Sequence, residues 1–147
     1  MIMKSPRLSH RVPESLKIGA RVSFSRTLTD GDVALFIGAT WDVNPYHTDD
    51  VFVSMTPFQK RFVPGLLTAS LLTHLGGLWA FLATEMNFEF LLPVYIGETI
   101  TAEAEIFELD ELSGGVSLRC RCVNQSGKEV LRAVVKGFPG QFESREK

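Results

Sequence analysis

Asp42 and His47, in the segment DVNPYH, are the residues best suited to acid–base chemistry. They lie five residues apart, which on a straight helix would separate them by about 140° in azimuth, because each residue turns by about 100°. Asn44-Pro45 predicts a turn, braced by the Asn44 amide, that could bring the carboxylate and the imidazole onto one water molecule. Such a pair can act as general base and general acid near neutral pH. For the string alone, the favoured interpretation is a structural loop.

A second feature is Gly65, which follows Pro64. If a helix begins here, the Gly65 N–H has no intrahelical partner and lies at the positive end of the helix dipole. Because glycine has no side chain, a substrate carbonyl could come close, so the amide is a candidate one-donor oxyanion hole. Proline followed by glycine is also an ordinary start of a helix.

The element that must position these residues is the uncharged, mostly apolar segment Phe62–Thr84. Apolar residues on nearly every face predict a helix that is buried all round. A bilayer span is the alternative for a run of this length. We favour the central helix of a sheet-wrapped domain, because Gly65, Gly76 and Gly77 disfavour a membrane segment and because strand-like alternation follows.

The region before this helix contains one predicted strand and two shorter helices. The strand is Ala20–Leu28, where apolar residues recur with period two. Thr29 then caps a helix and forms a capping box with Asp32 in place of glutamate. Thr48 is predicted to cap a second helix over Asp49–Ser54.

The region after the helix is rich in predicted strands. Their apolar positions alternate with polar ones over Phe88–Leu92, Ile100–Ile106, Val116–Cys122 and Val130–Phe138. A turn at 113–115 and a hairpin loop at Asn124–Gly127 separate the later strands. The resulting order predicts an α+β fold, in which a long helix is wrapped by an antiparallel sheet.

Size and composition fit one domain over residues 16–140, with tails at 1–15 and 141–147. The chain has 147 residues and a formal net charge of −2, which gives no overall attraction to nucleic acid. No signal-peptide pattern is present at the N-terminus, and we expect a cytoplasmic protein that does not bind membranes. Cys120 and Cys122 are too far apart along a strand for a disulfide and are expected to be reduced core thiols.

Three blocks together resemble a known family. DVNPYH at 42–47, PGLLTAS at 64–70 and PVYIGETI at 93–100 are similar to the MaoC-like dehydratases, and most similar to the (R)-specific enoyl-CoA hydratases. The resemblance covers roughly residues 16–138. It implies the hotdog fold, a long helix wrapped by a curved antiparallel sheet, in subunits that usually form dimers. We expect a homodimer or a multiple of dimers, because the edges of such a sheet favour pairing with another chain.

The resemblance also implies a reaction and a site. Asp42 and His47 would hold the water, and the Gly65 amide would polarise the thioester carbonyl. Water would add reversibly across the 2,3 double bond of an enoyl-CoA to give an (R)-3-hydroxyacyl-CoA, without a metal or redox cofactor. The residues expected to contact this acyl-CoA substrate are Asn44, Pro64, Gly65 and Leu66.

This sequence departs from the family pattern at three positions. Trp41 precedes the aspartate where a small residue is usual, Pro64 stands where many members have histidine, and Tyr46 is bulkier than the common aliphatic residue. These changes leave the catalytic pair intact and bear on the acyl-chain preference and on the identity of the thioester.

Two other functions remain open from the sequence. A hotdog thioesterase is disfavoured because one large group of these enzymes carries an acid on the central helix, and none occurs between Arg61 and Glu85. A non-catalytic acyl-binding or partner-binding domain is disfavoured by the intact pair. His74 is interpreted as a hydrogen-bonded core or pocket histidine. Residues that could include a contact to coenzyme A phosphates are Lys60, Arg61, Arg119, Arg121, Lys128 and Arg132.

Overall fold

The computed structural model describes residues 16–140. In chain order the elements are β1 (Arg21–Thr27), α1 (Asp30–Thr40), α2 (Pro45–Thr48), α3 (Asp50–Ser54), α4 (Gly65–Leu78), β2 (Leu82–Phe90), β3 (Thr99–Asp110), β4 (Gly115–Val123) and β5 (Glu129–Phe138). The predicted tails at 1–15 and 141–147 lie outside the described residues.

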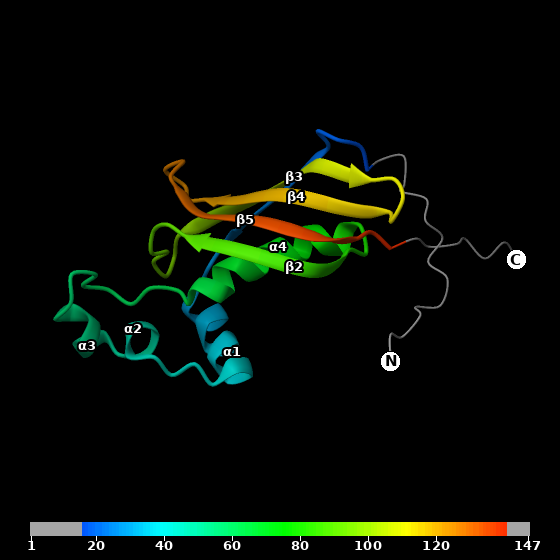
Figure 1. The fold of residues 1–147 in the computed structure, drawn as a ribbon. Coiled ribbons are helices and arrows are strands. Elements are labelled where there is room, and N and C mark those ends of the chain that lie inside the picture. Colours follow the sequence, from blue (N-terminus) through cyan, green and yellow to red (C-terminus); the bar gives the residue numbers. More distant parts are fainter. Residues whose placement is uncertain (1–15, 141–147) are drawn as a thin grey trace, which may run out of the picture.

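The five strands form one antiparallel sheet in the order β1-β3-β4-β5-β2. Helix α4 lies along one face of this sheet, while α1, α2 and α3 lie beyond it, on the side of α4 away from the sheet (Figure 1). Alternate residues of β3, from Ile100 to Ile106, are buried because they face the helix. The arrangement confirms the predicted α+β hotdog fold.

Helix α4 and the inner face of the sheet form the core. Leu71, Leu72 and Leu75 of the helix are buried in the same apolar cluster as Cys120 and Cys122 of β4. Both cysteines are free thiols, as predicted. Burial raises the pKa of each thiol to about 12, because a thiolate would be poorly solvated there.

The predicted length of the central helix was wrong. Helix α4 begins at Gly65 and ends at Leu78, and the chain then reverses through Ala80, which has a left-handed φ of 46°. Leu82–Phe90 then form β2. An apolar run cannot distinguish a buried helix from the half-buried strand that follows it. Within residues 16–140, no helix is both long and apolar enough to span a bilayer.

The prediction that this helix is buried all round was also wrong for the single chain. Leu66 and Leu78 are each 59% exposed, because the sheet covers only one side of α4. The other side of the helix keeps an apolar surface that residues 16–140 do not cover.

The helix caps were partly predicted. Thr29 and Asp32 form the expected capping box at the start of α1. Thr48 does not cap α3; Asp49 does, by accepting a hydrogen bond of 2.9 Å from the Phe52 N–H. The Thr48 hydroxyl instead donates to the Asn44 carbonyl at 3.1 Å, which closes the short helix α2 that the sequence did not predict.

Candidate active site

The loop between α1 and α2 is shaped by its own side chains. Trp41 ends α1 in a left-handed conformation with φ of 57°. The Asn44 N–H then donates to Asp42 Oδ1 at 3.2 Å, and the Tyr46 N–H donates to Asn44 Oδ1 at 3.1 Å. These two successive Asx turns reverse the chain. The prediction that the Asn44 amide braces the turn is confirmed.

This turn brings Asp42 and His47 together, as predicted for a turn at Asn44-Pro45. Asp42 Oδ2 lies 4.0 Å from His47 Nε2, while Asp42 Oδ1 remains in the turn. The separation is too long for a direct hydrogen bond and suits a bridging water. The His47 side chain is 9% exposed and that of Asp42 is 40% exposed, so the pair opens to solvent from the aspartate side.

The hydrogen bond at Nδ1 determines which nitrogen of the neutral His47 ring carries the hydrogen. His47 Nδ1 lies 2.7 Å from the Phe62 carbonyl oxygen. A carbonyl can only accept, so Nδ1 carries the hydrogen and donates it. In the neutral ring, Nε2 is then left with its lone pair directed toward Asp42. The Phe62 ring also packs edge-on against the imidazole.

Gly65 is the first residue of α4, and the preceding Pro64 offers no side-chain cap. The Gly65 N–H therefore has no intrahelical acceptor and lies at the positive end of the helix. A cavity of about 280 Å³ lies beside this end and is lined mostly by apolar residues, among them Phe62, Gly65 and Phe90. Neither Pro64 nor Leu66 lines it, so their predicted contact with substrate stays a prediction.

Two features of this cavity could not be read from the sequence. The Phe90 ring lies directly against Gly65, where an added Cβ would be 2.9 Å from two ring carbons. Thr68 also lines the cavity, and its hydroxyl oxygen is buried without a hydrogen-bond partner among the described residues. The side of Gly65 that lacks a side chain is thus covered by the Phe90 ring, which is half-exposed.

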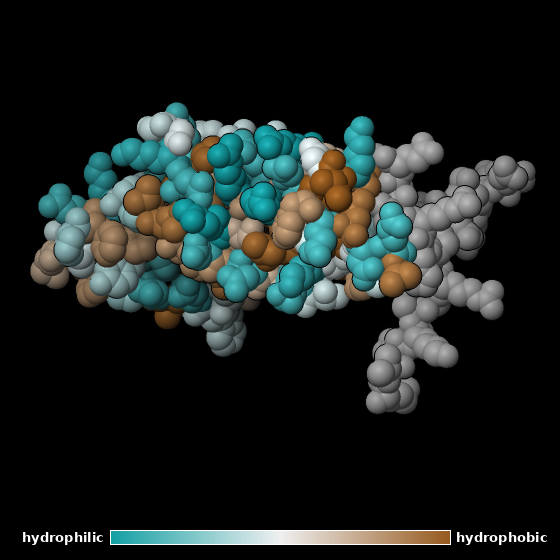
Figure 2. Space-filling view, turned by 45° about the horizontal axis from the view of Figure 1, so that its top comes forward, coloured by the Kyte–Doolittle hydropathy of each residue, from teal (hydrophilic) through white to brown (hydrophobic). Residues whose placement is uncertain are grey.

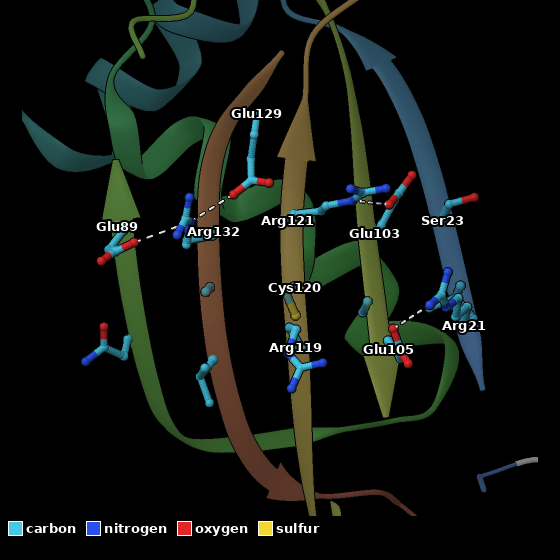
Figure 3. A pocket seen from close by; sticks show the side chains of 15 residues that line it. Arg21, Ser23, Glu89, Glu103, Glu105, Arg119, Cys120, Arg121, Glu129 and Arg132 are labelled. Atoms are coloured by element: carbon cyan, nitrogen blue, oxygen red, sulfur yellow. Dashed lines mark hydrogen bonds and ion pairs between the residues drawn. The ribbon is translucent and has the colours of Figure 1, made fainter. Parts of the chain in front are cut away.

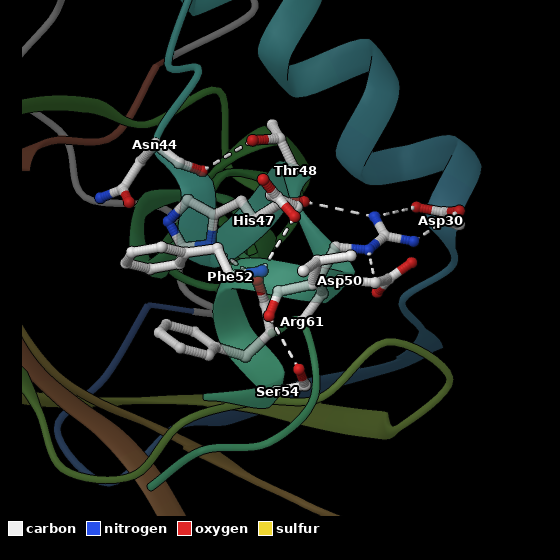
Figure 4. Close-up of polar contacts among 11 residues, drawn as sticks. Asp30, Asn44, His47, Thr48, Asp50, Phe52, Ser54 and Arg61 are labelled. Atoms are coloured by element: carbon white, nitrogen blue, oxygen red, sulfur yellow. Dashed lines mark hydrogen bonds and ion pairs between the residues drawn. The ribbon is translucent and has the colours of Figure 1, made fainter. Parts of the chain in front are cut away.

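The remaining sequence candidates lie elsewhere. His74 is exposed and stacks on Phe24 with ring centroids 3.9 Å apart, so its predicted place in the core or a pocket was wrong. Arg61 is held by Asp30 and Asp50 and is not free to bind phosphate (Figure 4). Sequence reasoning missed its structural partners because they come from distant elements.

A larger hollow, of about 980 Å³, lies on the outer face of the sheet, away from Asp42 and His47. The space-filling view, in which this face comes forward, shows hydrophilic residues interspersed with apolar ones (Figure 2). Four arginines and four glutamates line the hollow. The ion pairs among them are Arg21–Glu105, Arg121–Glu103, Arg132–Glu89 and Arg132–Glu129 (Figure 3). We interpret this face as a solvated ion-pair ladder and not as the reactive site.

No cluster of three or more histidine, cysteine, aspartate or glutamate side chains suited to a metal ion occurs within the part of the chain that the structure describes. Asp42 and His47 are groups that can perform acid–base catalysis. The Phe62 ring, which packs against His47, also lines the apolar cavity at the N-terminus of α4.

Comparison with known proteins gives a consistent picture. Residues 14–121 match the family described as MaoC like domain. The chain is 33% identical over 131 residues to an (R)-specific enoyl-CoA hydratase of Aeromonas caviae, covering 84% of this chain and 96% of the relative. It is 32% identical over 123 residues to a 3-hydroxyacyl-[acyl-carrier-protein] dehydratase of Solanum lycopersicum, covering 79% and 73%. The solved structure of an (R)-hydratase from A. caviae, involved in PHA biosynthesis, superposes with a TM-score of 0.81 at 29% identity, covering 86% of this chain and 98% of that one.

Proposed function

We propose that this chain, which belongs to the MaoC-like family, catalyses the reversible addition of water to a 2-enoyl thioester, giving an (R)-3-hydroxyacyl thioester. The substrate class follows from the names of its relatives, an enoyl-CoA hydratase and a 3-hydroxyacyl dehydratase. The observation that carries the proposal is that one short turn places Asp42 Oδ2 4.0 Å from His47 Nε2.

In this mechanism Asp42 and His47 hold one water between them. As the water oxygen bonds to C3 of the substrate, one group of the pair takes a proton from it. The 2,3 double bond opens, and a proton is delivered to C2, so the atoms of one water are added in total. His47 can exchange the proton at Nε2 because Nδ1 is committed to the Phe62 carbonyl. No electrons enter or leave the substrate, so the reaction needs no redox cofactor.

The Gly65 N–H has a separate role, because negative charge develops on the thioester oxygen as water adds at C3. A donor fixed at a helix N-terminus stabilises that charge without reorganisation, an effect typically worth ~10²–10³-fold in rate. The apolar cavity beside Gly65 gives the acyl chain a place out of water. Its wall carries Phe90, which adjoins Gly65 and therefore adjoins the expected position of the thioester.

The decisive experiment offers crotonyl-CoA to the purified protein and follows the absorbance of the conjugated thioester together with free thiol. Loss of conjugation without free thiol is the expected result, and Asp42→Asn serves as the matched control. Release of free thiol would identify a thioesterase, and no change would identify a binding domain. Repeating the assay with crotonyl thioester on acyl-carrier protein determines which carrier is preferred.

The uncovered apolar surface supports a homodimer. Within residues 16–140, β2 is an edge strand of the sheet, and Leu82 and Met86 are exposed on it. Leu66 and Leu78 are exposed on the adjacent α4. A second copy that pairs along β2 would satisfy the edge and cover the helix together. We expect light scattering to give the mass of two chains at micromolar concentration and Met86→Lys to weaken this association. A monomer of the unaltered protein would refute the pairing.

A further inference from the structure

Arg61 contacts three elements at once. Its Nη1 and Nη2 donate to the two carboxylate oxygens of Asp30 at 3.0 and 3.2 Å, and its Nε donates to Asp50 at 2.7 Å. Nη1 also donates to the main-chain carbonyl of His47 at 3.3 Å. Asp30 is the first residue of α1 and Asp50 is the first residue of α3. The guanidinium therefore joins the two helices on either side of residues 41–49, the loop that carries Asp42 and His47 (Figure 4).

Phe62, the residue after Arg61, binds the side chain of His47 and the main chain that precedes it. The Phe62 carbonyl accepts the Nδ1 hydrogen of His47, and the Phe62 N–H donates to the Tyr46 carbonyl at 3.4 Å. Arg61 and Phe62 therefore fix the main chain and the side chain of His47 together. Gly65 follows three residues later, so this short segment connects the imidazole directly to the start of α4.

Arg61 keeps its positive charge in this position. Hydrogen bonds to Asp30 and then to Asp50 raise its pKa, and the side chain is only 21% exposed. The guanidinium fork provides five N–H donors in one plane, and this geometry matches the Asp30 carboxylate in a bidentate manner. A lysine ammonium, a compact point donor, cannot contact Asp30 in this way while also reaching Asp50 and the His47 carbonyl.

We propose that Arg61 is a positioning residue that sets where His47 lies relative to Gly65, an inference that rests on the function proposed above. Arg61 touches no reacting atom. It acts through the His47 carbonyl and through the two helices that hold the loop. A displacement of about 1 Å at a catalytic group can cost up to ~10²-fold in rate, so the expected effect falls on turnover and not on substrate binding.

The test compares Arg61→Met with Arg26→Met. Arg26 is the matched control because it pairs with Asp32 in the first turn of the same helix α1 and does not contact His47. We expect Arg61→Met to lower kcat by roughly ten- to a hundredfold with little change in KM, and Arg26→Met to leave both unchanged. Arg61→Lys should recover only part of the loss. Unchanged kcat in folded Arg61→Met would overturn the proposal.

Two further measurements separate positioning from general destabilisation. In a His47→Gln background, Arg61→Met should cause no additional loss, because both changes act on the same group. Independent losses that multiply would refute the proposal. If Arg61→Met does not fold, Asp50→Asn, which removes one acceptor of the guanidinium, is used in its place with the same outcomes.

An NMR measurement tests the position of His47 without any assay of activity. The Nδ1 hydrogen of His47, bonded to the Phe62 carbonyl, should give a downfield proton signal in NMR that Arg61→Met shifts or broadens while Arg26→Met does not. An unmoved signal would overturn the positioning role whatever the reaction. An unaltered protein without hydratase activity, but with a signal that Arg61→Met moves, would instead reject the proposed function alone.

Discussion

Substitution of Gly65 by valine tests the helix N-terminus most sharply, because two different explanations exist for the glycine. The first is access: a side chain at this position would shield the amide from a thioester oxygen. The second is packing: an added Cβ would stand 2.9 Å from two carbons of the Phe90 ring, against an optimal separation of about 3.5–4.0 Å. Both explanations predict a loss of activity in Gly65→Val, so that variant alone decides nothing.

The two explanations differ in the expected magnitudes. Overpacking against Phe90 should cost about 1–3 kcal/mol of unfolding free energy, at the lower end because the ring is half-exposed and can withdraw. Loss of access to the oxyanion donor should cost ~10²–10³-fold in kcat. Gly77→Val is the control, because an added Cβ there meets no atom within 4 Å and the residue lies on the same helix.

The double variant Gly65→Val, Phe90→Ala separates stability from rate. Removal of the ring gives the valine room, so the urea midpoint should return toward that of Phe90→Ala alone. Turnover of crotonyl-CoA should stay low, because the valine methyl groups still flank the amide. Recovery of turnover to the level of Phe90→Ala would refute the oxyanion role and leave Gly65 as a packing residue.

Four other substitutions test the surrounding structure. Asp42→Asn and His47→Gln should each lower hydration by ~10²–10⁴-fold, and the double variant should be scarcely worse than the worse single variant; strictly additive losses would exclude a shared water. Trp41→Gly should raise the unfolding free energy by about 1 kcal/mol by relieving a left-handed residue whose side chain is mostly exposed, and a lower urea midpoint would contradict this. The hydrogen bond from Arg61 lowers the pKa of Asp30, so this pair stabilises the fold above the ordinary aspartate pKa and loses its effect as the pH falls through the lowered value. The urea midpoint of Asp30→Asn should therefore approach that of the unaltered chain in acid. A difference between the two midpoints that does not depend on pH would count against this pair.

Local signals in the sequence predicted much of this structure. The capping box of Thr29 and Asp32 and the hairpin loop Asn124–Gly127 depend only on residues a few positions apart, and both are found. The alternation along β3 predicted which of its residues face the helix. The convergence of Asp42 and His47 was also accessible, because the turn between them is made by its own side chains.

Contacts between distant segments were not accessible in the same way. Arg61 meets Asp30 across 31 residues of sequence, and no local pattern distinguishes it from a solvated arginine. The contact of Phe90 with Gly65 likewise depends on how β2 returns past the start of α4. The end of α4 was wrongly predicted because it depends on a left-handed backbone at Ala80. Alanine rarely adopts this conformation, so the residue type gives no signal for it.

The two buried cysteines provide an intrinsic reporter of unfolding. They are the only cysteines of the chain, and both lie on β4, the central strand of the sheet. Burial raises the pKa of both thiols to about 12, so they are protonated at pH 7, and it keeps alkylating reagents away as well. Alkylation therefore requires β4 to become exposed, and its rate measures that opening under the conditions of the activity assay, without denaturant. Each variant can thus be examined for opening of its core and for turnover in one buffer, using thiols that the reaction does not involve.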